Sequence, residues 1–199
     1  MKFRHLAACA VAVLTLIGLS GCRTKVGSAA FVGGDRITDG DVGKYLTVKS
    51  TPYSNQRGNE VRPRSLVLGV LIQEQLFEKA LAANGVAATD AELDKVKDDV
   101  LRGVSEEQLT SEITKSNFTG SFEPLYLRSQ ELFVLFGQRA GARSAEDVVA
   151  ALNKVGIRVQ VSPRYGTWNG SHLSLENGLD PGLSSVLTLE STAAPTPAP

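Results

Sequence analysis

The chain has 199 residues, with 21 basic and 21 acidic side chains, so its formal net charge at pH 7 is zero. This balance excludes the strong positive field with which nucleic-acid-binding proteins attract phosphates, and we expect no nucleic-acid partner. The length fits one domain of ordinary size behind an N-terminal targeting segment.

The N-terminus has the pattern of an export signal. Basic residues precede an uncharged apolar run from Leu6 to Leu19, which is shorter than the roughly 20 residues that a membrane-spanning helix needs. The run ends in Leu19-Ser20-Gly21-Cys22, which resembles the lipobox of bacterial lipoproteins. An ordinary secretory signal, cut after Gly27-Ser28-Ala29, is the alternative.

The lipobox predicts a lipid-anchored protein. We expect residues 1–21 to be removed as a signal peptide and Cys22 to carry acyl chains such as palmitate, which hold the protein on the extracytoplasmic face of the cell membrane. Because Cys9 leaves with the signal and Cys22 is lipidated, no intramolecular disulfide is possible. Residues 22–28 are expected to form a short tether.

The first expected elements are a short hairpin and a helix. Residues 29–32 favour a strand, Gly33-Gly34 a tight turn and residues 36–37 a second extended piece. Thr38 stands three residues before Asp41, which predicts the start of a helix through Leu46.

Five more helices are predicted downstream. A helix from Pro63 to about Ala83 is apolar on nearly its whole circumference and should be the most buried one. Two short helices follow the capping boxes that begin at Thr89 and Ser105. A long helix covers about residues 122–139, and a compact amphipathic helix runs from Ser144 to Gly156.

A second strand is expected at residues 157–161, which alternate apolar and polar side chains. We expect it to pair with the N-terminal strand, which gives a mainly α domain with a small β-sheet over residues 29–168. Beyond it, residues 169–190 predict an irregular extension, and the Pro- and Ala-rich residues 191–199 predict a disordered tail.

The sequence contains no strong signal for catalysis. Nucleotide-binding and hydrolase motifs are missing, and His172 is the only histidine after the predicted signal. A calcium loop over Asp35, Asp39 and Asp41 is conceivable, but Asp39 and Asp41 fit better as acids in the first turn of a helix. We therefore expect a protein that is not an enzyme and that has no metal or cofactor.

Two stretches resemble the N-terminal chaperone region of the SurA-like family. They are the opening residues 31–42 (FVGGDRITDGDV) and the closing residues 159–168 (VQVSPRYGTW). The resemblance implies a helical peptide-binding domain that holds unfolded or extended polypeptide clients outside the membrane. Many members also carry a parvulin-type prolyl isomerase domain, but the stretch between Arg139 and Ile157 is too short for one. The resemblance therefore implies holding without isomerase activity.

Aromatic side chains on the later helices are the candidates for peptide binding: Phe118, Phe122, Tyr126 and Phe133. Exposed on helices, they would line an apolar groove that tolerates many sequences. The alternative is that these rings belong to the core. A different function is also open, that of an adaptor or structural lipoprotein that docks one dedicated partner in the cell envelope.

Overall fold

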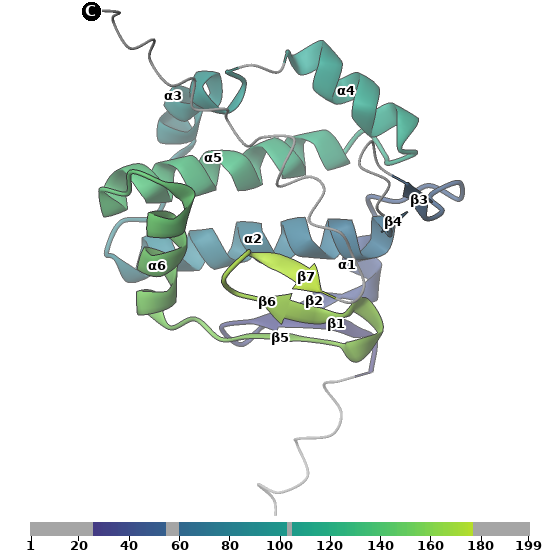
Figure 1. Cartoon of the computed structure of the whole chain (residues 1–199), viewed down its shortest axis with the longest axis horizontal. Coiled ribbons are helices and arrows are strands. Elements are labelled where there is room, and N and C mark those ends of the chain that lie inside the picture. Colours follow the sequence, from purple (N-terminus) through teal and green to yellow (C-terminus); the bar gives the residue numbers. More distant parts are fainter. Residues whose placement is uncertain (1–25, 55–59, 103–104, 177–199) are drawn as a thin grey trace, which may run out of the picture.

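The computed structural model describes residues 26–54, 60–102 and 105–176 (Figure 1). Within these residues the chain is mainly helical with a small β-sheet, as predicted, and it also carries two short hairpins. The expected signal peptide, Cys22 and the predicted disordered tail lie outside the described residues.

The main sheet joins the two ends of the domain. It has the order β2 (Asp35–Thr38), β1 (Ser28–Val32), β5 (Val159–Val161), with both pairings antiparallel. The turn between β1 and β2 is Gly33-Gly34, and both residues have positive φ (57° and 95°), as the tightest hairpin turns require. Phe31 stands opposite Arg36 on one side and Gln160 on the other. The predicted pairing of the N-terminal strand with residues 157–161 is confirmed.

The first helix, α1 (Asp39–Gly43), is shorter than predicted. Its start is a reciprocal capping box, in which Thr38 Oγ1 accepts from the Asp41 amide (3.1 Å) and the Asp41 carboxylate accepts from the Thr38 amide (2.9 Å). The helix ends early because two of its five residues are glycines, which are poor helix formers. Leu46, expected in this helix, instead forms an isolated bridge with Phe118.

Helix α2 (Pro63–Ala83) is the centre of the fold, with the predicted boundaries. Figure 1 shows α2 between the main sheet and α5 (Phe122–Ala140), while α3 (Asp90–Val100) and α4 (Glu106–Lys115) lie on the far side of α5. α2 is buried on most of its circumference because it packs on β1, α1, α5 and α6 (Ala145–Val155). The prediction that this helix is the most buried one is confirmed by its many core side chains: Val67, Leu68, Val70, Leu71, Ile72, Leu76, Phe77, Ala80 and Leu81.

The outer helices bury only narrow stripes. Helix α3 buries Leu93, Val96 and Val100, and α4 buries only Ile113. Both begin with the capping boxes that the sequence predicted, at Thr89 and at Ser105. These caps give the two polar helices defined ends even though each contributes little to the core.

Two small hairpins were not predicted. The first pairs β3 (Tyr53–Ser54) with β4 (Glu60–Val61). The second pairs β6 (Thr167–Asn169) with β7 (Ser174–Glu176), just after the 3-10 turn η1 (Pro163–Tyr165). The expectation of an irregular extension from residue 169 is therefore wrong for residues 169–176.

Tertiary contacts explain this second hairpin. Leu173 and Leu175 are buried in the core, and Gln73 Nε2 on α2 donates a hydrogen bond to the Leu173 carbonyl oxygen (2.7 Å). The Asn169 side chain accepts from the backbone amides of Ser171 and His172, which fixes the turn between the strands. Strands of three residues are too short to show the alternation of apolar and polar side chains from which a strand is predicted.

Candidate functional site

The aromatic residues predicted to bind peptide lie mostly in the core. Phe118, Phe122 and Tyr126 are buried, with exposed fractions of 7%, 1% and 3%. Phe118 and Phe122 stack with ring centroids 4.4 Å apart, and Phe133 is half-buried and meets Phe77 edge to face at 5.5 Å. An open aromatic groove is thus the wrong interpretation for the first three rings, since they are buried and Phe122 packs on Tyr45, Phe118 and Tyr126.

Burial has a chemical consequence at Tyr126. Loss of water around its hydroxyl raises the pKa of this phenol well above the ordinary value. The neighbouring Ser129 is fully buried and donates its hydroxyl hydrogen to the Tyr126 carbonyl oxygen (2.8 Å). This part of α5 therefore serves packing.

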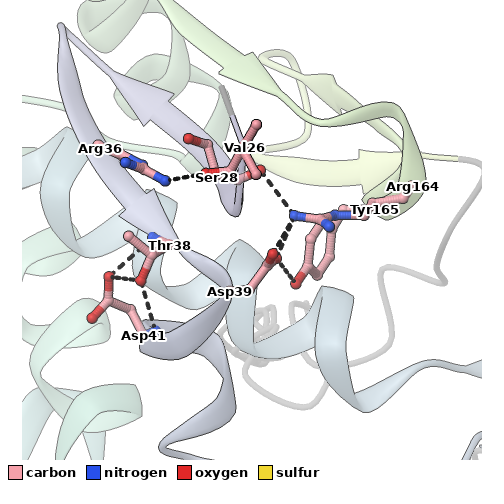
Figure 2. Close-up of polar contacts among 8 residues, drawn as sticks. All are labelled: Val26, Ser28, Arg36, Thr38, Asp39, Asp41, Arg164 and Tyr165. Carbon is pink, nitrogen blue, oxygen red and sulfur yellow. Dashed lines mark hydrogen bonds and ion pairs between the residues drawn. The ribbon is translucent and has the colours of Figure 1, made fainter. Parts of the chain in front are cut away.

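The three aspartates near the N-terminus have separate partners. Asp35 pairs with Lys79 at 2.5 Å, and Asp41 pairs with Lys44 at 2.8 Å. Figure 2 shows Asp39 turned toward Arg164 and Tyr165 while Asp41 turns toward Thr38. The interpretation of Asp39 and Asp41 as first-turn acids is confirmed, and the three carboxylates do not converge on one point as calcium ligands would.

Hydrogen bonds to Asp41 hold its charge in place. Lys44 and Thr38 donate to this carboxylate, and together they lower its pKa to about 2.

Among the residues that the structure describes, no group of three or more histidine, cysteine, aspartate or glutamate side chains is placed to hold a metal ion.

A pocket of about 210 Å³ lies where α2, α6, β5 and the β6–β7 hairpin meet. It is partly open to solvent, and none of its lining side chains is charged. Six of them are apolar or aromatic: Leu76, Leu152, Ile157, Val159, Trp168 and Leu173.

Two of the lining side chains carry polar groups, Asn153 on α6 and the indole of Trp168 on β6, and both lie near Gly170. A methyl group at Gly170 would lie 3.7 Å from Asn153 Oδ1 and 3.8 Å from Trp168 Nε1, so both polar atoms are close to this glycine. Asn153 is exposed, which places it at the rim, and Trp168 is half-buried. Within the described residues neither side chain has a hydrogen-bond partner.

The sequence did not indicate this pocket as a site. Eight of its nine lining residues lie between Leu152 and Leu173, while Leu76 comes from α2, and three of the nine belong to the β6–β7 hairpin that the sequence did not predict. The available signal was the single tryptophan in a stretch that is otherwise poor in apolar side chains.

Glu74 on α2 has a strongly shifted pKa. Burial, with a smaller contribution from the nearby Glu78 carboxylate, raises the pKa of Glu74 to about 7, although Arg128 opposes the shift. Arg128 Nε lies 3.4 Å from Glu74, and its Nη2 donates to Glu78 at 2.9 Å. The guanidinium links α2 to α5 and reduces the repulsion between the two acids.

His172 is exposed in the turn between β6 and β7, and Cys22 lies outside the described residues. Across residues 26–54, 60–102 and 105–176, no helix has the length and apolar character that crossing a membrane requires.

The fold and pocket define a mainly helical domain with a small antiparallel sheet and a small surface pocket whose lining side chains are uncharged. No protein-family model, curated protein or solved structure matches the chain.

Proposed function

We propose that this chain is a lipid-anchored chaperone or folding factor that binds unfolded or extended polypeptide on the extracytoplasmic face of the membrane. It works by binding alone, without isomerase activity and without a cofactor. The membrane contact is made by the acyl chains on Cys22.

One observation carries the proposal: the two stretches that resemble the SurA-like family contact each other. Strand β1 of the opening stretch pairs with β5 of the closing stretch. Asp39 of the opening stretch also binds Arg164 and Tyr165 of the closing stretch (Figure 2). Two separate patterns that form one folded unit are better support than either pattern alone.

The structure of β1 favours the lipobox over the alternative signal. Ala29 is fully buried and Ser28 is nearly so, and both belong to the central strand of the sheet. Cleavage after Ala29 would remove two of the five residues of β1, whereas cleavage before Cys22 leaves the strand intact.

The connection between α5 and β5 supports binding without isomerase activity. That stretch contains α6 and short links, and α6 packs on α5 and α2 through buried Val148 and Leu152. An inserted catalytic domain has no place at this point of the chain.

The test uses the purified mature chain, residues 22–199, with Cys22→Ser to keep it in solution. At stoichiometric ratio it should slow the aggregation of a chemically unfolded client, measured by light scattering. An inert protein of similar size and charge at the same concentration is the control. Failure to slow aggregation together with failure to bind unfolded polypeptide in titration would overturn the proposal.

Crosslinking in cells separates this function from the adaptor alternative. A holding chaperone should yield many crosslinked clients of different sizes. One dominant crosslinked band would favour the adaptor instead.

A further inference from the structure

We propose that the pocket between α2, α6, β5 and the β6–β7 hairpin binds one large apolar side chain of an extended polypeptide, while Asn153 and Trp168 hold the adjoining peptide group. This inference rests on the proposed function and specifies the chemistry of the ligand.

The size of the pocket suits one side chain. An apolar protein cavity of about 150 Å³ is enough to bind benzene, and this pocket measures about 210 Å³. Sites for drug-sized ligands and cofactors are larger, roughly 300–1,000 Å³. A leucine, isoleucine or phenylalanine side chain therefore fits better than a whole cofactor.

The lining selects an uncharged, apolar group. Leu76, Leu152 and Leu173 come from three different elements and face the same space, and no charged side chain contributes to the wall. An ionised side chain placed there would lose hydration without gaining an oppositely charged partner, which is costly. The pocket should therefore reject aspartate and lysine.

The polar atoms near Gly170 suit a peptide group. The Trp168 indole N–H can only donate a hydrogen bond, whereas the Asn153 side-chain amide can donate and accept. A peptide group offers one acceptor and one donor, and both need partners once water is displaced. A pure hydrocarbon chain would leave the Asn153 and Trp168 groups without partners, so polypeptide is the better occupant.

Trp168 supplies its own readout because it is the only tryptophan in the chain. The probes are short, capped peptides of glycine with one central leucine, alanine or aspartate. In the mature chain, the leucine peptide should change Trp168 emission in a saturable way. The alanine peptide should bind at least several-fold more weakly, and the aspartate peptide should produce no change.

Variants at the rim and in the mouth of the pocket test the hydrogen bond to the peptide group and the binding of the side chain. Asn153→Ala should weaken binding of the leucine peptide roughly three- to tenfold, the effect of one lost hydrogen bond. Lys154→Ala is the matched control, because Lys154 is the exposed neighbour of Asn153 on α6 and does not line the pocket, and this variant should bind as the unchanged chain does. Gly170→Leu should abolish binding by filling the mouth, with circular dichroism to verify that the fold is intact.

The outcomes separate this inference from the proposed function. A chain that slows client aggregation but whose Trp168 emission does not respond to the leucine peptide would overturn the pocket assignment and leave the chaperone function standing. Equal binding of a short-chain alcohol and the leucine peptide, with no effect of Asn153→Ala, would overturn the peptide assignment in favour of a plain apolar ligand.

Discussion

The carboxylate of Asp39 accepts hydrogen bonds from Arg164, whose Nη2 lies 2.5 Å from both carboxylate oxygens, across 125 residues of sequence. The Tyr165 hydroxyl donates to the same carboxylate at 2.8 Å, and Arg164 also donates to the Ser28 carbonyl oxygen at 3.0 Å. These contacts fasten η1 to the start of α1 and to β1. Tyr165 is buried, and the side chain of Arg64 is a second hydrogen-bond partner within reach of its hydroxyl.

Replacing Asp39 should therefore destabilise the whole domain. Asp39→Ala removes one partner of a buried hydroxyl and of a half-exposed guanidinium, and we expect the free energy of unfolding in urea to fall by about 1–2 kcal/mol. Tyr165→Phe alone should cost about 1 kcal/mol. Asp35→Ala is the control: its carboxylate is largely exposed and its ion pair should be worth less than about 0.5 kcal/mol. Equal effects of Asp39→Ala and Asp35→Ala would contradict a specific role for the Asp39 contacts.

Glu74 should make stability fall as the pH rises from 4.5 to about 7. In this interval the unfolded chain has released the Glu74 proton, whereas the folded chain still holds it because burial raises the pKa to about 7. The free energy of unfolding of Glu74→Gln, measured in urea relative to the unchanged protein, should therefore increase between pH 5 and pH 8 by on the order of 2–3 kcal/mol. Glu74 is only 20% exposed, so solvent screening reduces this little.

Glu92→Gln provides the matched comparison for that titration. Hydrogen bonds from Thr89 and Arg139 lower the pKa of Glu92 to about 2, so Glu92 is ionised in both states above pH 5.5. Its difference from the unchanged protein should be flat across the same interval. A flat curve for Glu74→Gln as well would show that Glu74 titrates normally in the folded chain.

Two helical glycines should respond oppositely to alanine. A Cβ on Gly69 in α2 would meet nothing within 4 Å, so Gly69→Ala should raise the melting temperature through a helix-propensity gain of about 0.5–1 kcal/mol. A Cβ on Gly137 in α5 would lie 3.0 Å from Val148 Cγ2 on α6. We expect Gly137→Ala to lower the melting temperature because the buried Val148 side chain must shift to make room for the added methyl group.

Shortening Val148 tests whether its contact with the new methyl group causes the destabilisation by Gly137→Ala. In the double variant with Gly137→Ala and Val148→Ala, the free energy of unfolding should exceed the value expected from adding the two single effects. Additive effects would rule out a direct contact between the two positions.

Cys22 carries the prediction about the membrane. Cys22→Ser removes the thiol that we propose accepts lipid, so the protein should move from the membrane fraction to the soluble fraction of cells. Immunoblots of the two fractions measure this. Unchanged membrane retention of the variant would refute anchoring through this residue.

Helix starts were readable from the sequence because they depend on local chemistry. The capping boxes at Thr89, Ser105 and Ser144 satisfy backbone amides within four residues, and each begins a helix in the structure. The nearly continuous apolar surface of residues 63–83 predicted the central helix for a similar reason: only a helix packed on several sides can bury it.

The pocket and the role of the aromatic rings depended on contacts that no local pattern encodes. Leu173 and Leu175 hold the β6–β7 hairpin only because α2 lies beneath them. Spacing on α5 likewise places Phe122 and Tyr126 on one face, but whether that face meets solvent depends on where Tyr45 and Phe118 pack. The sequence therefore located the rings and could not decide their exposure.

Strand β1 acquires its two neighbours at very different times during synthesis. Its hairpin partner β2 follows after two residues, whereas β5 exists only once helices α2 to α6 have been made. Until then the edge of β1 that β5 covers has no strand to pair with, and η1 cannot engage Asp39. The nascent domain thus passes through a long interval with an incomplete main sheet, which is closed by β5, the last strand of that sheet to be made.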